Sequence, residues 1–331
     1  MSNTNLIHAK REKNDEFYTQ MRDIEKEMQA YLEYDPDVFR DKTVLLPCDD
    51  PTWSNFVKYF ALNFESLGLK KLISTSYAAD GGHGKVFVLC GENELQWEYL
   101  TGDGDFRSAE VTALRDEADI VITNPPFSLF REFMAWLSDG DVLFSVIGNK
   151  NAITYKGIFP LIKDNKMWVG NRSMSDGFMF SIPKSSQDEM LEGKPGSRYR
   201  TVDGEILGSA PAMWFTNIQH GRHHEPLKLA TQAENEIHNK RITSNANSYK
   251  KYDDYDAIEI PVTSGIPSDY IGVMGVPISF LDKYCPEQFE IVGHIGTPVV
   301  EDQRVYKRLL IRRTRARANE FTVPTHEIQA A

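Results

Sequence analysis

The chain has 331 residues, of which 41% are hydrophobic, 11% aromatic and 26% charged, a composition typical of a folded globular protein with one large or two unequal domains and unlike that of a disordered or fibrous chain. No apolar stretch is long enough to span a bilayer, and the polar first residues lack the apolar centre of a secretory signal, so we expect a cytoplasmic protein. The formal net charge of −11 excludes a surface that is basic throughout.

Helices and strands alternate along the first half of the chain. Hydrophobic residues at helical spacing predict helices, and short apolar runs bounded by turns predict strands. The expected helices cover 13–34, 54–68, 107–118 and 127–140, and the expected strands lie within 42–51, 70–78, 118–123 and 141–149, with a hairpin-like stretch at 81–106. This order predicts a parallel sheet with helices on both faces, the Rossmann-like α/β class. Ligands of such sheets bind outside the carboxyl ends of the strands.

Past residue 150 the pattern changes to short apolar runs separated by polar loops. Two long polar stretches, 184–207 and 231–256, are predicted to be loops, and the second is predicted to be mobile or ordered only by a partner. The apolar runs predict short strands within 166–171, 177–182, 212–218, 255–260 and 289–296.

The sequence DIVITNPPFSLF at 119–130 ends a strand with an amide. Asn124 follows the apolar run directly, so its side chain is expected at the ligand-binding edge of the sheet. Pro125 and Pro126 fix φ at about −65° and push the residue before each of them out of the helical region, which stiffens the backbone and leaves the Pro125 carbonyl free. The Asn124 side-chain oxygen and this carbonyl can then converge on one amino group, with the flat ring of Phe127 beside them.

Such an arrangement suits the alkylation of an exocyclic amine on a nucleobase. The lone pair of this amine is delocalised into the ring, and two acceptors that take its two protons favour the form whose lone pair points at an electrophile. The Phe127 ring would stack on the base. Because the amine is unreachable inside a duplex, the base would have to be flipped out.

Six segments resemble the EcoRI-type adenine-specific DNA methyltransferases, a family in which NPPF after a strand is the catalytic motif. The resemblance implies a Rossmann-like methyltransferase fold, S-adenosylmethionine as the cofactor, double-stranded DNA as the substrate, and no metal. It covers nearly the whole chain and is weakest at 165–260. The segments are DEFYTQ at 15–20, CDDPTWSNFVKYFALNF at 48–64, GDGDFRS at 102–108, NPPFSLFREF at 124–133, NAITYKGIFPLIK at 151–163 and VPISFLDKYCPEQFEIVG at 276–293.

The resemblance also implies roles for residues. Residues 1–164 would form the catalytic and S-adenosylmethionine-binding domain, and residues 165–331 a target-recognition region that partly continues the sheet. The implied catalytic set is Asn124, Pro125 and Phe127. The implied cofactor site is made by Phe17, Tyr18, Thr19, Pro47, Cys48, Asp49, Asp50, Tyr77, Asp105 and Phe106.

Two features depart from the family pattern. The turn after the first strand, PCDDPTWS, contains no glycine, although a glycine-rich loop is common there in methyltransferases. At the end of the second strand Tyr77 stands where an acid is expected to hold the ribose hydroxyls, and the nearest acid is Asp80. Asp49 and Asp50 are also equally suited to cap the helix that starts near Trp53.

Basic residues cluster near the C-terminus. The stretch 304–317 holds seven Lys or Arg and no acid, although the chain as a whole is acidic. Its apolar residues leave open a half-buried strand with basic flanks, a solvated helix face or a disordered tail. Because local charge decides whether a polyanion can dock, we expect DNA contacts from Arg304, Lys307, Arg308, Arg312 and Arg313.

Histidine and cysteine patterns do not indicate a metal site. HGRHH at 220–224 has neither helical spacing nor neighbouring cysteines, and we interpret it as a polar loop. Cys48, Cys90 and Cys285 are far apart in the sequence, which indicates reduced thiols and not a disulfide framework.

The favoured hypothesis is a site-specific DNA adenine methyltransferase that acts as a monomer, separately from any cognate restriction endonuclease. The alternative is a catalytically degenerate module that binds DNA or S-adenosylmethionine. The missing glycine loop motivates that alternative, and the intact NPPF argues against it. A nicotinamide-dependent dehydrogenase would need the G-x-G-x-x-G turn that the chain lacks after its first strand. Cytosine is a competing target, because the same acceptors serve the amines of both bases.

Overall fold

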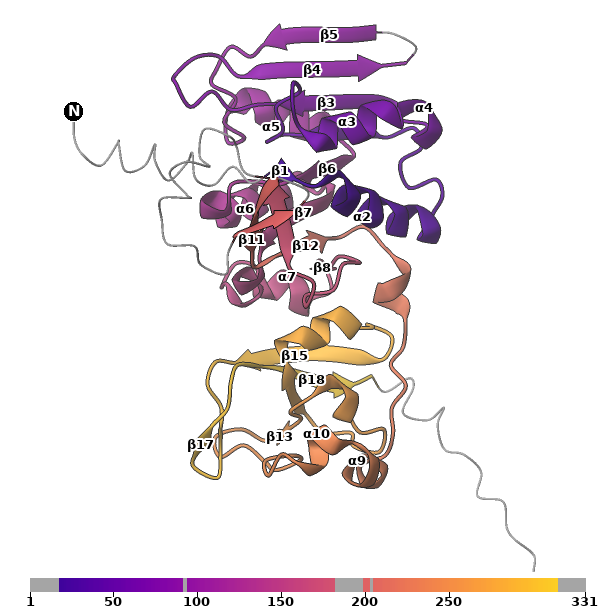
Figure 1. The fold of residues 1–331 in the computed structure, drawn as a ribbon, viewed down its shortest axis with the longest axis vertical. Helices are drawn as coiled ribbons and strands as arrows, with labels where there is room; N and C mark the ends of the chain where they lie inside the picture. The colour runs from indigo at the N-terminus through magenta and orange to yellow at the C-terminus, as the bar shows by residue number, and fades with distance from the viewer. Residues whose placement is uncertain (1–17, 92–93, 182–198, 203–204, 315–331) are drawn as a thin grey trace, which may run out of the picture. The chain divides into compact units, whose positions relative to one another are not determined.

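The structure is a computed structural model, and it describes residues 18–91, 94–181, 199–202 and 205–314. Contacts divide the chain into two compact units (Figure 1). The first unit runs to Leu161 and resumes over Lys166–Gly221, and the second comprises Ile162–Asn165 and the chain from Arg222 onward. The sequence prediction divided the chain after residue 164. The first unit reaches Gly221 because two later strands pair with its main sheet.

An eight-stranded sheet forms the centre of the first unit (Figure 1). The four central strands, β3, β2, β6 and β7, are parallel, and antiparallel strands extend the sheet at both sides. This parallel centre confirms the predicted Rossmann-like α/β class, and the hairpin expected at 81–106 is also confirmed. In spatial order the strands are β5 (Glu94–Tyr99), β4 (Lys85–Cys90), β3 (Lys71–Thr75), β2 (Thr43–Leu46), β6 (Ile120–Thr123), β7 (Leu143–Asn149), β12 (Ala212–Thr216) and β8 (Trp168–Val169).

Helices cover both faces of this sheet. The crossover through α3 leads from β2 outward to β3, whereas the crossover through α6 leads in the opposite direction, from β6 outward to β7. Because such crossovers are right-handed, α3 and α6 lie on opposite faces. The central strands are therefore buried on both sides, as in Val44, Leu45 and Val121. The helices in this part of the chain are α2 (Met21–Tyr34), α3 (Asn55–Leu62), α4 (Phe64–Leu67), α5 (Ala109–Glu117), α6 (Phe130–Gly140) and α7 (Phe159–Lys163), with the 3-10 helices η1 (Phe127–Leu129) and η2 (Lys150–Thr154).

A second, four-stranded antiparallel sheet also belongs to the first unit. One of its strands lies within 184–207 and a second begins there, so the prediction that this stretch is a loop is wrong where the structure describes it. Residues 182–198 and 203–204 lie outside the described residues. In spatial order the strands are β1 (Tyr18–Thr19), β9 (Phe178–Ser181), β11 (Glu205–Ala210) and β10 (Tyr199–Val202).

The second unit has its own four-stranded sheet and a two-stranded ribbon. Strand β18 lies inside this sheet, between β14 and β15, and its Leu309 and Ile311 are fully buried. Of the three interpretations of 304–317, the half-buried strand with basic flanks is therefore confirmed as far as Arg313. In spatial order the sheet contains β13 (Ile258–Glu259), β14 (Met274–Pro277), β18 (Arg308–Arg313) and β15 (Phe289–Ile295), and the ribbon contains β16 (Val299–Val300) and β17 (Gln303–Arg304).

Two short helices occupy part of 231–256, so the prediction that this stretch is a loop is wrong there. Thr231 and Glu234 form a capping box, in which the Thr231 hydroxyl accepts from the Glu234 N–H at 3.2 Å and the Glu234 carboxylate accepts from the Thr231 N–H at 2.7 Å. The helices here are α9 (Gln232–His238) and α10 (Lys240–Thr243), with the 3-10 helices η3 (Gly221–His224), η4 (Thr263–Gly265) and η5 (Ile278–Lys283). None of the described helices has the length and apolar character needed to cross a membrane.

An ion pair lies in the interior of the second unit. Arg308 on β18 donates to both carboxylate oxygens of Glu259 on β13, at 2.7 to 3.1 Å, and the Tyr252 hydroxyl donates to the same carboxylate. Glu259 is 1% exposed and Arg308 is 8% exposed. A buried pair of this kind costs free energy to desolvate, and loss of one partner leaves the other charge uncompensated.

We expect Arg308→Ala to lower the free energy of unfolding by about 3 to 5 kcal/mol, because it leaves Glu259 charged and buried. The matched control is Arg312→Ala on the same strand, where the partner Glu290 is exposed and the loss should be no more than about 1 kcal/mol. Urea unfolding of both variants measures the difference. Equal losses in the two variants would show that the Glu259 pair is not structural.

Candidate active site

The segments that follow the parallel strands meet at one edge of the main sheet. Parallel strands end on the same side, so the turn after β2, the segment after β3, the NPPF motif after β6 and η2 after β7 share this carboxyl edge. This placement agrees with the expectation for Asn124, which directly follows Thr123, the last residue of β6.

The NPPF motif forms a stiff, extended turn. Pro126 has φ −54° and ψ 125°, and its carbonyl accepts from the Leu129 N–H at 3.0 Å, which starts η1. The Pro125 carbonyl accepts no hydrogen bond from the described part of the chain. Asn124 is partly exposed, but its Oδ1 atom is buried. Phe127 is partly exposed, and its ring packs edge to face on Phe180, with ring centroids 6.4 Å apart.

Asp49, in the turn after β2, joins this turn to three other segments at this edge. Its two carboxylate oxygens accept from the Ser54 hydroxyl at 2.7 Å and from the Thr123 hydroxyl at 2.6 Å. Its N–H donates to the Thr75 carbonyl at 3.0 Å, and its carbonyl accepts from the Ser74 hydroxyl. The start of α3, the end of β3 and the end of β6, which carries Asn124, are therefore tied to one residue.

Ser54, not Asp49 or Asp50, caps α3: its hydroxyl accepts from the Phe56 N–H at 3.0 Å. The suggestion that Asp49 or Asp50 caps this helix directly is therefore wrong. Asp50 instead accepts from the Thr52 N–H at 2.8 Å and forms an ion pair with Lys85 at 2.8 Å.

Burial changes the acid–base properties of this turn. It raises the pKa of Asp49 from 3.8 to about 6, although the hydrogen bonds from Thr123 and Ser54 oppose the shift. Burial also raises the pKa of the Cys48 thiol well above its ordinary value, with the Asp49 charge adding to the effect, so Cys48 is held as a neutral thiol. For Asp50 burial acts in the same direction, but hydrogen bonds from Lys85 and Thr52 outweigh it and lower the pKa.

The loop at 102–106 packs against the end of β3. Gly104 has φ +84°, and a Cβ atom there would lie 2.2 Å from the Ser76 carbonyl oxygen, so only glycine fits. The Ala78 N–H donates to the Asp103 carbonyl at 2.7 Å, and the Gly84 N–H donates to the Gly102 carbonyl at 2.9 Å. These contacts bring Asp105 to the same edge as Tyr77, which is about half exposed.

Asp105 and Phe106 are both predicted to bind the cofactor, but their side chains differ in exposure and in contacts. Arg107 donates to both Asp105 oxygens at 2.6 to 3.2 Å, and these bonds lower the pKa of the carboxyl. Arg107 also pairs with Glu132 at 2.5 Å. The Phe106 side chain is 4% exposed and packs on Phe133 of α6, with ring centroids 5.0 Å apart. Only its backbone is therefore placed to meet a ligand.

The predicted residues at the start of the chain lie beside α3. Thr19 is buried, and its carbonyl accepts from the Asn55 side chain at 2.8 Å. The Thr19 hydroxyl oxygen is buried without a hydrogen-bond partner in the described residues. Tyr18 pairs through its backbone with Ser181, and Phe17 lies outside the described residues. Pro47 is buried, and its carbonyl accepts from the Thr75 hydroxyl at 3.0 Å.

The five basic residues predicted to contact DNA fall into two groups. Arg304 and Lys307 are exposed, and Arg312 is exposed but paired with Glu290 at 2.8 Å. Arg308 and Arg313 are each 8% exposed, and Arg313 donates to the Ser268 carbonyl in addition to other contacts. Partners and not simple alternation explain this division, because Arg308 is enclosed with the buried Glu259, whereas Arg312, on the same face of β18, meets the exposed Glu290.

Sequence reasoning missed several residues that shape the site: Ser54, Asn55, Lys85, Arg107 and Thr123. Ser54 was readable as a helix cap, since serine directly precedes the apolar pattern of α3. The partners of Asp49 and Asp50 had no sequence signal, because Thr123 and Lys85 are 74 and 35 residues away.

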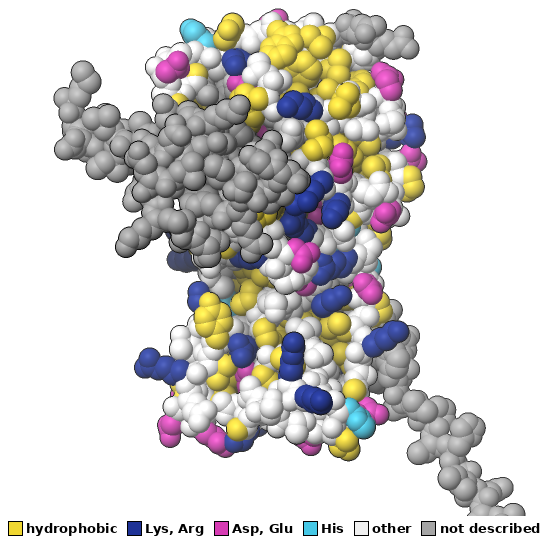
Figure 2. Space-filling model, in the orientation of Figure 1, with side chains coloured by type: hydrophobic (Ala, Val, Ile, Leu, Met, Phe, Trp, Pro, Cys, Tyr) yellow, Lys and Arg dark blue, Asp and Glu magenta, His cyan; other side chains and the backbone are white. Residues whose placement is uncertain are grey.

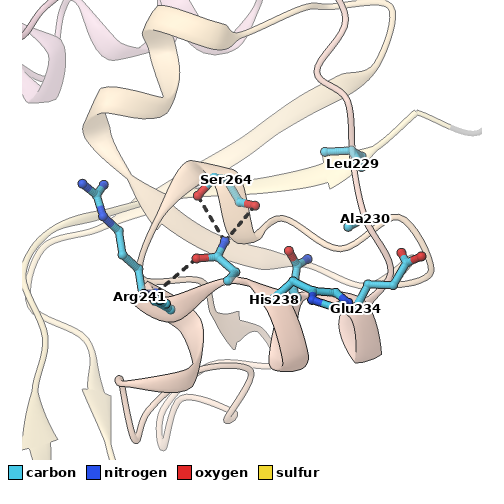
Figure 3. Close-up of a pocket in the computed structure, with 9 residues that line it drawn as sticks. Leu229, Ala230, Glu234, His238, Arg241 and Ser264 are labelled. Carbon is cyan, nitrogen blue, oxygen red and sulfur yellow. Dashed lines mark hydrogen bonds between the residues drawn. The ribbon is translucent and has the colours of Figure 1, made fainter.

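A separate open pocket of about 720 Å³ lies in the second unit (Figure 3). The Asn239 side chain braces it by donating to the Ser264 carbonyl and hydroxyl, each at 3.2 Å, while accepting from the Arg241 N–H. None of the residues predicted from the sequence lines it. Its lining comprises Leu229, Ala230, Glu234, Asn235, His238, Asn239, Lys240, Arg241 and Ser264.

The histidines of HGRHH have partners in the structure. Nδ1 of His224 lies 2.7 Å from a Glu287 carboxylate oxygen, and His220 and His223 also make polar contacts. Within the described ranges, no group of three or more His, Cys, Asp or Glu residues is placed to hold a metal ion.

The fold and the strand-end NPPF motif together define a Rossmann-like methyltransferase of the amino-group type. The family model for "Adenine-specific methyltransferase EcoRI" matches residues 5–94 and 85–327. The chain belongs to this family. The match leaves no support for the dehydrogenase hypothesis.

Named relatives agree with this assignment. The chain is 42% identical over 307 residues to the type II methyltransferase M.EcoRI of Escherichia coli, which covers 87% of this chain and 88% of the relative. It is 34% identical over 291 residues to M.MpnI of Mycoplasma pneumoniae, covering 88% and 85%. It is 37% identical over 294 residues to M.MgeORF184P of Mycoplasma genitalium, covering 88% and 86%. No solved structure matches the chain.

The raised pKa of Asp49 predicts a pH-dependent stability that one substitution removes. The folded Asp49 carboxyl keeps its proton up to about pH 6, whereas the unfolded one loses it near pH 3.8. The contribution of Asp49 to the free energy of unfolding is therefore fully present below pH 3.8 and is lost as the pH rises through about 6. The loss is on the order of 3 kcal/mol. The free energy of unfolding of Asp49→Asn, relative to the natural chain, should therefore rise by about this amount between roughly pH 4 and 7.

Urea unfolding of both proteins across this pH range measures the difference. All other carboxyls contribute equally to the two proteins, so the difference isolates Asp49. A difference that stays constant with pH would contradict the raised pKa.

Proposed function

We propose that the chain is a site-specific DNA adenine methyltransferase, which transfers a methyl group from S-adenosylmethionine to the N6 amine of an adenine flipped out of double-stranded DNA. The observation that carries the proposal is the place of Asn124, directly after β6 at the carboxyl edge, on a backbone stiffened by two prolines. Family membership supports adenine over cytosine as the target. The description of the relatives as type II methyltransferases supports a DNA substrate with a defined site.

Asn124 and Pro125 prepare the amine for reaction. The Asn124 side-chain oxygen and the Pro125 carbonyl each accept one N6–H, which turns the nitrogen lone pair toward the methyl donor. Phe127, braced by Phe180, offers a ring face on which the base stacks. Because the Asn124 oxygen is buried in the structure, the residues around it have to move apart to admit a base.

The cofactor site is proposed at the same edge, among the predicted residues Tyr18, Thr19, Pro47, Cys48, Asp49, Asp50, Tyr77, Asp105 and Phe106. When bound, S-adenosylmethionine supplies an electrophilic methyl group, and the transfer requires no metal and no covalent enzyme intermediate. Two observations support the fit: the Thr19 hydroxyl is buried without a partner in the described residues, and the Asp105 carboxylate is held ionised at the edge by Arg107. Asp49 serves by shaping the turn, since both its oxygens already accept hydrogen bonds.

Double-stranded DNA is the proposed partner of the second unit as well. On the face seen in Figure 2, Lys and Arg side chains are spread over this unit among hydrophobic ones. Arg304, Lys307 and Arg312 are the exposed residues of the predicted basic set, and they suit phosphate contacts. Arg308 and Arg313 act indirectly, by holding β18 in its sheet. We place the enzyme in the cytoplasm as a monomer that acts separately from any restriction endonuclease. Nothing favours the degenerate binding module.

Replacing the catalytic amide tests the proposal directly. Asn124→Ala removes one of the two acceptors, so kcat for methyl transfer to DNA should fall at least about a hundredfold while the fold is kept. The control is Asn63→Ala at the far end of α3, where the amide bonds the Tyr59 carbonyl and no other group among the described residues, so activity should be unchanged. Transfer of tritiated methyl groups to duplex DNA measures the rate. A folded Asn124→Ala protein with the natural kcat would exclude the proposed site.

The cofactor assignment has its own test. Asp105→Ala removes a charged acceptor, so the Kd for S-adenosylmethionine should rise about tenfold or more. Glu132→Ala is the matched control, because Glu132 binds the other side of the same Arg107 guanidinium and is not part of the proposed site. Its Kd should change less than about twofold. Isothermal titration calorimetry measures both values, and equal effects in the two variants would place the cofactor elsewhere.

A further inference from the structure

We propose that Arg131, stacked on the ring of Tyr155, binds a phosphate of the DNA backbone beside the active site and so positions the duplex for base flipping. The inference rests on the proposed function, because it assumes that DNA approaches the edge that carries Asn124. It names a substrate-positioning residue outside both the catalytic motif and the basic C-terminal segment.

The two residues come from segments that leave neighbouring parallel strands. Arg131 lies in the first turn of α6, four residues after Phe127, and Tyr155 follows η2 at the end of β7. Strands β6 and β7 pair in parallel, with Thr123 opposite Val146. Both segments therefore start at the carboxyl edge that holds the NPPF motif, and the Arg131–Tyr155 pair lies on the approach to this edge.

The guanidinium group is held in place without being neutralised. Its central carbon lies over the Tyr155 ring, 4.2 Å from the centroid, a distance typical of a cation–π contact. Arg131 is exposed and makes no ion pair or hydrogen bond through its side chain within the described ranges. The adjacent acid, Glu132, is paired with Arg107 at 2.5 Å. Stacking thus orients the planar group and leaves its N–H donors available.

Backbone hydrogen bonds hold Tyr155, and with it the ring on which Arg131 stacks. The Tyr155 carbonyl accepts from the N–H groups of Ile158 and Phe159, each at 2.9 Å, and its own N–H donates to the Ala152 carbonyl at 2.9 Å. The next residue, Lys156, is exposed and has no acidic partner in the described part of the chain.

Exposed cations without an acidic partner are a notable local feature in a chain that is acidic as a whole. The net charge is −11, and several exposed arginines are paired with acids, as Arg40 is with Asp37 and Arg312 with Glu290. Two unneutralised cations at Arg131 and Lys156, one of them pre-oriented on an aromatic ring, create local positive charge on the edge where a polyanion must dock. A planar guanidinium with available donors matches the oxygens of a phosphate.

The test is the salt dependence of DNA binding by the full chain. One lost phosphate contact lowers the slope of log K against log salt by about 0.9, so Arg131→Gln should reduce the slope by about one unit and weaken binding at low salt by about tenfold. Arg131→Lys keeps the charge but loses the planar guanidinium with its paired N–H donors. The slope of this variant should stay near that of the unmutated protein, while its affinity for DNA falls. Fluorescence anisotropy with a labelled mixed-sequence duplex measures both.

The matched control is Lys70→Gln. Lys70 is an exposed cation that directly precedes β3, so it lies at the opposite, amino edge of the same sheet, and its removal should leave the slope unchanged. Tyr155→Leu should weaken DNA binding with little change in slope, because it removes the support and not the charge.

Three results would overturn the inference. If the unmutated protein binds and methylates DNA and Arg131→Gln has the same salt slope for DNA binding, Arg131 makes no phosphate contact. A weaker affinity for S-adenosylmethionine in that variant, with DNA binding intact, would instead assign Arg131 to the carboxylate of the cofactor. A natural chain that neither binds nor methylates DNA would remove the proposed function itself, and the inference with it.

Discussion

The hydrogen bonds of the Asp49 carboxylate hold the carboxyl edge of the sheet together. One oxygen accepts from Thr123, the residue directly before Asn124, and the other accepts from Ser54, the cap of α3. Removing a carboxylate from water costs free energy, and the two hydroxyl donors only partly offset that cost, as the raised pKa shows. The chain therefore accepts a locally unfavourable charge in return for fixing the strand end from which Asn124 projects. Burial of this charge lowers the free energy of unfolding at neutral pH, but the hydrogen bond to Thr123 fixes the position of Asn124.

Local patterns predicted what depends on local physics. The apolar runs around Val44 and Ile122, the prolines after Asn124 and the glycine ending α4 each bias the backbone within a few residues, so the parallel sheet, the strand-end amide and the helix boundary were readable from the sequence. The capping box at Thr231 was equally local, and the loop assigned there overlooked its T-x-x-E pattern in favour of overall polarity.

Long-range pairing could not be read in this way. Whether Arg308 faces solvent or Glu259 depends on the register between β18 and its neighbours, and a shift of one residue would exchange Arg308 for Lys307. The same holds for Phe106, whose neighbours on α6 lie 27 to 30 residues further along the chain. Basic composition therefore located the cluster of cations but not which of them reach the surface.

The contact between Gly104 and the Ser76 carbonyl joins the loop at 102–106 to the β4–β5 hairpin, because Gly84, at the start of that hairpin, lies against both. The Lys85–Asp50 ion pair connects the same hairpin to the turn after β2. Figure 2 shows hydrophobic side chains gathered where this hairpin lies, and Leu95, Trp97 and Tyr99 are its exposed apolar residues. A loop locked in this way cannot swing out alone. Any opening at the proposed cofactor site would therefore have to carry along the β4–β5 hairpin, whose inner strand is itself paired with β3 of the main sheet.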